Sequence, residues 1–343
     1  MSDAASLYDR ELEIARDIAL EASAIVKTYA GTNFCVFSKA GDEPVTEADH
    51  AANTLIVGRL AREFPNDAIL SEELPDDGSR LGADRVWMVD PIDGTRDFIL
   101  GDIGFAVMIG LCVAGRPTVG VVSQPLTDKT YLGVVGRGAW LERPGKPRSP
   151  LHTSTLEGPP GIRLVASKSH RTPRVDAVRA ALQIVDEMNI GSVGLKIGLV
   201  AEDARDLYVY TGGRTKIWDT CGPEAILIAA GGLITDMDGA PLRYTIADLY
   251  NRRGIVASNG PLHPSVLRSL APIVVSVTAR VLRKFASETF WRPTPATDGM
   301  LLTAAYSSSR RLVSRVTLTL LTIGASRMRR ASAAPSIMPL MPK

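Results

Sequence analysis

Residues 86–98 read Val-Trp-Met-Val-Asp-Pro-Ile-Asp-Gly-Thr-Arg-Asp-Phe. The apolar run Val86–Val89 has the length and composition of a buried strand. The strand is expected to end at Asp90, because Pro91 cannot continue a central strand and Gly94 permits backbone angles that a Cβ would forbid. The pattern therefore predicts a strand followed by a sharp turn that carries two carboxylates.

The predicted turn offers hard oxygen ligands in one small space. Asp90 and Asp93 can point to the same side, together with the carbonyl oxygen of Ile92. Carboxylates, carbonyls, water and substrate phosphate are the ligands that Mg²⁺ takes, at about 2.1 Å. The alternative is a loop in which both carboxylates only cap the next helix. The Pro, Gly and Thr residues of the turn each have a backbone role, which favours the metal site.

The whole turn resembles the signature of a known family. Asp-Pro-Ile-Asp-Gly-Thr at 90–95 is similar to the motif of the inositol monophosphatase superfamily of Mg²⁺-dependent, lithium-sensitive phosphatases. Three further segments resemble that family in the same order, namely Pro-Val-Thr-Glu-Ala-Asp at 44–49, Leu-Ser-Glu-Glu at 70–73 and Ile-Trp-Asp-Thr at 217–220. The resemblance extends from about Leu7 to about Gly260.

Helix and strand patterns alternate along the chain, which predicts an α/β or α+β layered fold. Helices are expected at 7–30, 48–63, 175–185 and 223–230, and strands at 86–89, 105–112, 117–123, 129–135, 163–166 and 207–210. Pro223 is expected near the first turn of its helix. The resemblance implies an alternating α-β-α-β-α sandwich. It divides the chain into an N-terminal metal-binding half, 1–155, and a C-terminal substrate-binding half, 156–270, with the active site between them.

The composition is that of a soluble globular protein, with 45% hydrophobic and 22% charged residues. The three cysteines, Cys35, Cys112 and Cys221, are far apart in the sequence, which argues against a disulfide framework and fits the cytoplasm. No signal-peptide pattern opens the sequence, and no apolar run reaches the ~20 residues of a membrane helix.

The net charge of +2 hides an asymmetry. Beyond Ala271 there are eleven Lys or Arg and two acidic residues, which leaves 28 basic and 35 acidic residues before that point. The acidic body suits a protein that gathers metal ions and does not suit one whose main partner is nucleic acid. Residues 271–343 are rich in Ser, Thr and Arg and lie outside the resemblance. We expect a disordered extension there, with a tether to nucleic acid or anionic membrane as the alternative.

The resemblance assigns the metal ligands. Glu72 and Asp90, with the carbonyl of Ile92, would hold a first Mg²⁺, and Asp90, Asp93 and Asp219 a second, for two or three ions per site. Such ions activate water and stabilise the leaving oxygen of a phosphate monoester.

The resemblance also assigns a catalytic pair, Thr95 and Asp49, because a hydroxyl bonded to a carboxylate can accept the proton of the attacking water. From the sequence alone, Asp49 is an ordinary helix residue. The amides of Gly94 and Thr95 are expected at a helix N-terminus, where they would cradle phosphate and bind substrate.

The second half resembles the bacterial 3'(2'),5'-bisphosphate nucleotidases, which remove the 3'-phosphate of adenosine 3',5'-bisphosphate, a by-product of sulfate activation. The matching segments are 167–170, 191–196, 218–225 and 251–259. Lys196 would meet the 5'-phosphate, and His170 and Ser192 would touch the nucleotide. The alternative for Lys196 is a solvated helix residue, and the alternative for His170 is an ordinary surface loop residue. Tyr210 stands where some relatives carry Arg or His, which removes one cation from the expected phosphate site.

These observations predict a Mg²⁺-dependent phosphoric monoester hydrolase that converts adenosine 3',5'-bisphosphate to AMP and phosphate. The alternatives are a phosphatase for inositol or sugar monophosphates and, in another class, a non-catalytic metal- or nucleic-acid-associated protein. The expected partner is a small phosphorylated molecule, not a membrane or a nucleic acid, and the resemblance is compatible with a homodimer.

Overall fold

A computed structural model describes residues 8–38, 43–168 and 172–271, and all of them fall within one compact unit, Met1–Phe285. His170 lies outside the described residues, as does the predicted extension apart from residue 271. In the described part of the chain, no helix is both long and apolar enough to cross a membrane.

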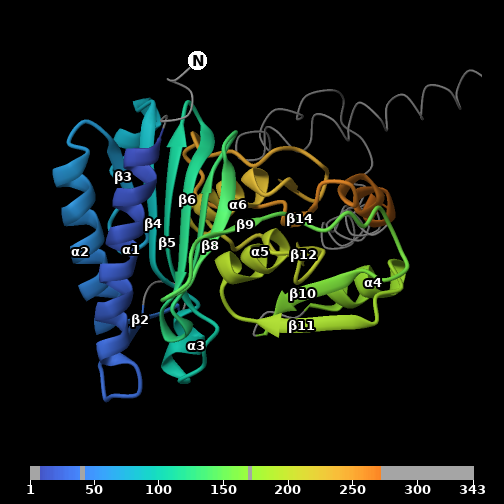
Figure 1. Ribbon diagram of the computed structural model, residues 1–343, viewed down its shortest axis with the longest axis horizontal. Coiled ribbons are helices and arrows are strands. Elements are labelled where there is room, and N and C mark those ends of the chain that lie inside the picture. The colour runs from blue at the N-terminus through green and yellow to red at the C-terminus, as the bar shows by residue number, and fades with distance from the viewer. Residues whose placement is uncertain (1–7, 39–42, 169–171, 272–343) are drawn as a thin grey trace, which may run out of the picture. The chain divides into compact units, whose positions relative to one another are not determined.

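The larger of the two main sheets has seven strands in the order β3-β4-β5-β6-β7-β8-β9 (Figure 1). Their bounds are Ala68–Ser71, Arg85–Asp93, Ala106–Val113, Arg116–Gln124, Lys129–Val134, Gly138–Glu142 and Ser149–Leu151. Only β3 and β4 pair in parallel, and the other neighbours are antiparallel. Both faces of the sheet are buried, so its central strands read as nearly continuous apolar runs.

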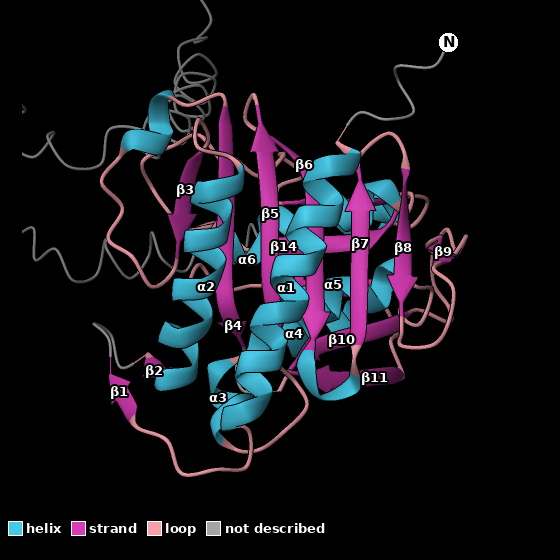
Figure 2. Cartoon of the chain, turned by 60° about the vertical axis from the view of Figure 1, so that its left-hand side comes forward, coloured by secondary structure: helices cyan, strands magenta, loops and turns pink. Residues whose placement is uncertain are grey.

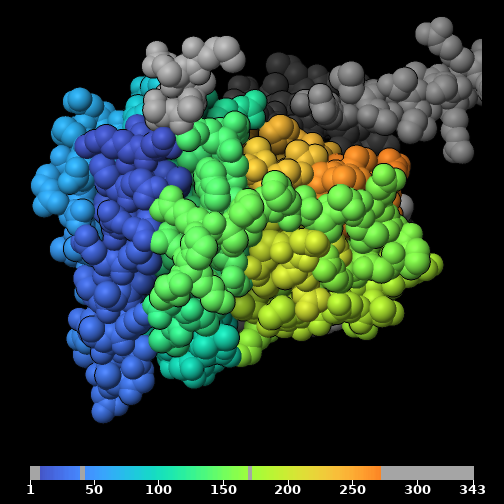
Figure 3. All heavy atoms as spheres, viewed as in Figure 1, coloured from blue at the N-terminus to red at the C-terminus, as the bar shows by residue number. Residues whose placement is uncertain are grey.

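Two long helices, α1 (Asp9–Tyr29) and α2 (Glu47–Glu63), cover one face of this sheet (Figure 2). On β5, Val107 and Ile109 pack toward these helices, whereas Ala106 and Met108 pack toward the opposite face. This alternation follows from the two-residue period of a strand. In the space-filling view of Figure 3, the two helices form the blue flank of the protein.

The smaller sheet has five strands in the order β11-β10-β12-β14-β13. Their bounds are Asp186–Ile190, Arg163–Ser167, Leu207–Tyr210, Ile255–Asn259 and Gly232–Thr235. Helices α5 (Val193–Ala201) and α6 (Trp218–Ala229) share one apolar core with the facing sides of both sheets. Helix α4 (Pro173–Ala181) and a helix at 263–271 pack on the outer face of the smaller sheet. The layers therefore alternate α-β-α-β-α, which confirms the predicted fold class.

A row of glycines lets α6 lie directly on the larger sheet. Gly110, Gly120 and Gly133 are paired side by side on β5, β6 and β7. A Cβ at Gly110 or Gly120 would overlap the backbone of Gly222 in α6, and one at Gly133 would overlap Ile226. The row therefore fixes the depth of the helix whose first turn carries Asp219.

Several boundaries differ from the sequence-based expectations. Helix α6 begins at Trp218, so the prediction that Pro223 lies near its first turn is wrong. Pro223 lies inside the helix and has no N–H to donate to a carbonyl one turn earlier, but tight packing on the glycine row holds the helix together. Helix α4 ends at Ala181 rather than at 185, and the short strand β9, Ser149–Leu151, was not predicted.

A two-stranded hairpin, β1 (Val36–Ser38) with β2 (Pro44–Thr46), leads directly into α2. Short helices occur at α3 (Thr95–Ile99), η1 (Ser79–Gly82) and η2 (Pro125–Thr127). The strands of the larger sheet precede residue 155 and those of the smaller sheet follow it. The assignment of metal binding to one half and substrate binding to the other stays a prediction.

Candidate active site

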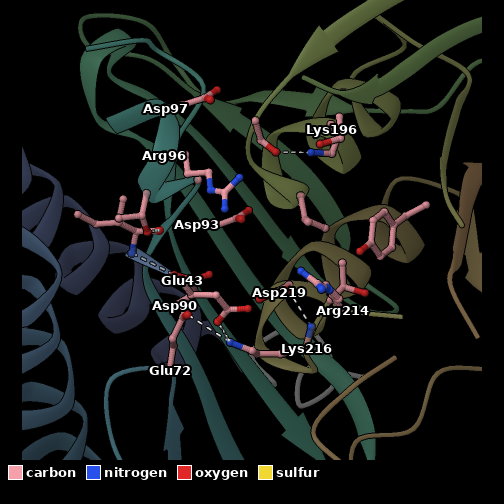
Figure 4. Close-up of a pocket in the computed structure, with 18 of the residues that line it drawn as sticks. Glu43, Glu72, Asp90, Asp93, Arg96, Asp97, Lys196, Arg214, Lys216 and Asp219 are labelled. Carbon is pink, nitrogen blue, oxygen red and sulfur yellow. Dashed lines mark hydrogen bonds and ion pairs between the residues drawn. The ribbon is translucent and has the colours of Figure 1, made fainter. Parts of the chain in front are cut away.

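A pocket lined by charged side chains of both signs lies at the ends of β4 and β12 and at the starts of α3, α5 and α6 (Figure 4). Its carboxylates are Glu43, Glu72, Asp90, Asp93, Asp97 and Asp219, and its cations are Arg96, Lys196, Arg214 and Lys216. Eight residues singled out from the sequence line it: Glu72, Asp90, Ile92, Asp93, Gly94, Thr95, Lys196 and Asp219. Residues far apart in the chain therefore converge on one space.

Strand β4 continues through Pro91 to Asp93, so the prediction that the strand ends at Asp90 is wrong. Pro91 is tolerated because it lies at an irregularity in the pairing with β5. Pairing between β4 and β5 shifts register between Asp90 and Asp93, so the two carboxylates lie on an irregular strand end. The backbone N–H of Ile92 donates to Asp90 Oδ1 over 3.0 Å. Gly94 has a φ of 96°, and a Cβ there would collide with the carbonyl oxygen of Gly104. This glycine allows the chain to enter α3 without moving the two carboxylates.

Asp49 lies behind the pocket and links α2 to the turn. Its Oδ2 accepts hydrogen bonds from the backbone N–H and the hydroxyl of Thr46, both over 2.7 Å, in a capping box at the start of α2. Its Oδ1 is 3.3 Å from Thr95 Oγ1, which also lies 3.0 Å from the Ile92 carbonyl oxygen. A hydroxyl has one proton to donate, so Thr95 can hold it toward either acceptor.

Asp93 is held by the start of α5. Its Oδ2 accepts from Ser192 Oγ over 2.5 Å and from the N–H of Gly194 over 3.0 Å. Ser192 is fully buried, caps α5 through Leu195 N–H and does not line the pocket. The contact of Ser192 with a nucleotide stays a prediction, since its hydroxyl is bonded to Asp93.

The carboxylates of the pocket repel one another, and Asp90 among them is buried. Burial first, and then the charges of Glu72, Asp93, Asp219 and Asp49, raise the pKa of Asp90 well above its ordinary value. The pKa of Asp219 is raised well above its ordinary value by burial and by Asp93 and Glu72, although its Oδ2 accepts from Lys216 N–H over 2.8 Å. Such a cluster is stabilised by any cation that enters it.

The donor set fits a hard divalent cation. All its side-chain ligands are carboxylate oxygens, and Ile92 adds a carbonyl, as Mg²⁺ prefers. Nevertheless, within 8–38, 43–168 and 172–271, no three His, Cys, Asp or Glu side chains converge closely enough to hold one ion as they lie. One oxygen of Asp93 accepts a hydrogen bond from Ser192, and one oxygen of Asp90 accepts from Ile92 N–H.

Lys216 lines the pocket and was not singled out from the sequence. Its ammonium lies 2.8 Å from Glu43 Oε2 and 3.5 Å from Glu72 Oε1, inside the acidic cluster. Arg96 and Arg214 also line the pocket and were not singled out. Arg96 directly follows Thr95, and Arg214 lies five residues before Asp219. Their closeness in sequence to predicted site residues was the signal that could have identified them.

Lys196 lines the pocket from α5 and is 1% exposed. Its ammonium donates to the carbonyl oxygens of Ile190, over 3.3 Å, and Gly191, and it lies 5.2 Å from the ring centroid of Tyr208. Burial lowers the pKa of Lys196 to about 8, against the opposing effect of Asp93 and other acids. It is therefore not a solvated helix residue, and it can carry or lose its charge near neutral pH.

The chain is similar to known proteins in both sequence and fold. A family model described as the inositol monophosphatase family matches residues 8–276. The chain is 36% identical over 256 residues to the 3'(2'),5'-bisphosphate nucleotidase CysQ of Escherichia coli, which covers 74% of this chain and 99% of the relative. It is 37% identical over 214 residues to the 3'-phosphoadenosine 5'-phosphate phosphatase of Mycobacterium bovis, covering 61% and 76% of the two chains. The crystal structure of CysQ from Bacteroides thetaiotaomicron superposes with a TM-score of 0.62 at 30% identity, covering 74% and 98%.

Proposed function

The chain belongs to the inositol monophosphatase family, and from that premise we propose that it removes the 3'-phosphate of adenosine 3',5'-bisphosphate to give AMP and phosphate. The observation that carries the proposal is the convergence of carboxylates, a Thr–Asp pair and several cations at one pocket. The 36% identity to a bisphosphate nucleotidase over nearly its full length supports the choice of substrate.

Family membership makes the protein a metal-dependent phosphatase, and we infer that the metal is Mg²⁺. Glu72 and Asp90, with the Ile92 carbonyl, would hold one ion, and Asp90, Asp93 and Asp219 a second; the number of ions, two or three, belongs to the proposal. Bound Mg²⁺ would activate the attacking water and neutralise charge on the phosphate and the leaving oxygen. The raised pKa values of Asp90 and Asp219 support this assignment, because cations would relieve the repulsion between these groups.

Thr95 and Asp49 move the proton. As the water oxygen bonds to phosphorus, Thr95 Oγ1 accepts a proton from the water and passes its own proton to Asp49 Oδ1, 3.3 Å away. The bond between phosphorus and the ribose 3'-oxygen breaks in the same displacement. The 3'-oxygen takes a proton from solvent water to become the 3'-hydroxyl of AMP, and Asp49 returns its proton to solvent. Thr46 holds Asp49 through two hydrogen bonds to the other carboxylate oxygen, which keeps Oδ1 directed at Thr95.

Phosphate positioning falls to the start of α3 and to the cations of the pocket. Gly94 and Thr95 line the pocket at the first turn of α3, where backbone N–H groups have no acceptor within the helix. Lys196 and the guanidinium groups of Arg96 and Arg214 add positive charge around the carboxylates. Two separated phosphates use this charge better than one, which favours a bisphosphate over an inositol or sugar monophosphate.

A phosphate-release assay tests the proposal. The full chain with Mg²⁺ is given adenosine 3',5'-bisphosphate, inositol 1-phosphate or AMP, and kcat/KM is measured for each. We expect the bisphosphate to be preferred and AMP to resist hydrolysis. Asp219→Asn should lose activity, whereas the matched control Asp248→Asn, which removes an exposed ion pair with Arg252, should keep it. A higher kcat/KM for inositol 1-phosphate would contradict the proposed substrate. The cytoplasmic location and the homodimer stay predictions.

A further inference from the structure

Lys216 places a permanent positive charge among the carboxylates proposed to bind metal. We propose that Lys216 is a built-in competitor of the divalent cation: its ammonium bridges Glu43 and Glu72 in the metal-free protein and keeps only Glu43 when metal binds. Lys216 would thereby lower the affinity for Mg²⁺ while stabilising the acidic pocket in the absence of metal. This inference rests on the proposed metal site.

The backbone of Lys216 is fixed, so its side chain has a short reach. Its N–H donates to Asp219 Oδ2 over 2.8 Å, and its carbonyl accepts from Asn251 Nδ2 over 3.2 Å. An isolated bridge also pairs it with Tyr250. The ammonium lies 5.2 Å from the ring centroid of Trp218, which borders it on one side. The side chain can therefore swing between neighbouring acids and cannot leave the cluster.

The two acids that it contacts differ in a way that suits a switch. Glu43 is 2.8 Å away with 40% of its side chain exposed, whereas Glu72 is 3.5 Å away with 18% exposed. The Lys216 side chain itself is 13% exposed. Glu43 thus offers a partner at the rim, and Glu72 offers one at the proposed metal position (Figure 4). Moving toward Glu43 keeps one ion pair and releases the other.

A comparison with Lys196 indicates that Lys216 serves the acidic cluster in particular. Both lysines line the pocket and both are desolvated. At Lys196, whose ammonium donates to two carbonyl oxygens, burial dominates and lowers the pKa. At Lys216 the charges of Glu72, Glu43 and Asp219 outweigh burial and raise the pKa. Lys216 therefore stays charged at neutral pH, where it repels an incoming Mg²⁺.

Isothermal titration of MgCl₂ into the metal-free full chain tests the inference without relying on activity. Lys216→Gln should bind Mg²⁺ about tenfold more tightly than wild type, which corresponds to about 1.4 kcal/mol. Glu43→Gln should bind it more weakly, because Lys216 then stays on Glu72. In the double variant, Glu43→Gln should have little further effect on Mg²⁺ affinity, because Lys216, which would otherwise stay on Glu72, has been replaced. The control Lys27→Gln, which removes an exposed lysine on α1 that pairs with Asp128, should match wild type.

The titration distinguishes a failure of the competitor role of Lys216 from a failure of the proposed metal site. Equal or weaker Mg²⁺ binding by Lys216→Gln, or an unchanged effect of Glu43→Gln in the double variant, would overturn the competitor role and leave the metal site intact. Absence of Mg²⁺ binding by wild type would overturn the proposed metal site and this inference with it. If Lys216→Gln fails to fold, the Mg²⁺ affinity of Glu43→Gln tests the inference alone. Weaker binding supports it, and unchanged or tighter binding overturns it.

Discussion

Glu224 gives the sharpest test of how the helix that carries Asp219 is stabilised. It lies on α6, is 7% exposed, and its Oε2 accepts a hydrogen bond from the Tyr244 hydroxyl, which also contacts Thr220 Oγ1 over 3.1 Å. Burial raises the pKa of Glu224 from 4.5 to about 7, although the Tyr244 hydrogen bond and Arg116 oppose the rise. The folded protein therefore holds a proton here that the unfolded chain releases at lower pH.

This difference makes the free energy of unfolding depend on pH. Below pH 4.5 the carboxyl is protonated in both the folded and the unfolded protein, so it does not lower the free energy of unfolding. Above pH 4.5 it lowers the free energy of unfolding progressively, until the pH passes about 7. The full shift corresponds to about 3 kcal/mol. Glu224→Gln keeps an acceptor for Tyr244 and removes the titrating group. The variant should be more stable than wild type by up to about 3 kcal/mol at pH 8, and by less than about 1 kcal/mol at pH 5.

Urea unfolding followed by tryptophan fluorescence at pH 5 and pH 8 measures the effect. Glu157→Gln, which changes an exposed glutamate, is the matched control and should show no such difference between the two pH values. A stability change for Glu224→Gln that is equal at both pH values, or a loss of stability at pH 8, would refute the electrostatic account of this helix.

Two further predictions concern the reaction. Thr95→Ala should lower kcat about a hundredfold with little change in KM, because the hydroxyl relays a proton to Asp49; steady-state kinetics showing only a raised KM would assign Thr95 to phosphate binding instead. Since the pKa of Lys196 is lowered to about 8, kcat/KM for adenosine 3',5'-bisphosphate should fall as the pH rises through about 8, as the lysine loses its charge. Lys196→Met should be less active and lack that limb of the profile; a limb that persists in the variant would exclude Lys196 as its source.

The metal-binding turn could be predicted because its information is local. An apolar strand that leads into Asp90-Pro91-Ile92-Asp93, with Gly94 permitting a positive φ, places both carboxylates at one strand end, although the strand runs three residues further than predicted. The layered fold was likewise predictable from the alternation of helix and strand patterns. Both conclusions need only short stretches of chain and the geometry of regular structure.

The remaining parts of the site depend on contacts between distant segments. Glu43 and Lys216 are 173 residues apart, and neither belongs to a pattern that predicts an ion pair. Strand β11, Asp186–Ile190, has mostly polar residues, because it is an edge strand, and so it shows no apolar strand signal. The start of α6 was missed because Pro223 is typical of a first turn, whereas the glycine row under the helix becomes visible only when three strands are paired.

The central claim is that this pocket removes the 3'-phosphate of a nucleotide bisphosphate. Phosphorus NMR of adenosine 3',5'-bisphosphate incubated with the full chain and Mg²⁺ observes both phosphates at once. For the wild-type protein, the account predicts that the 3'-phosphate resonance disappears, that free phosphate appears and that the 5'-phosphate resonance remains. With Asp219→Asn, the spectrum of the substrate should stay unchanged. Loss of the 5'-phosphate, or turnover that survives in Asp219→Asn, would contradict it.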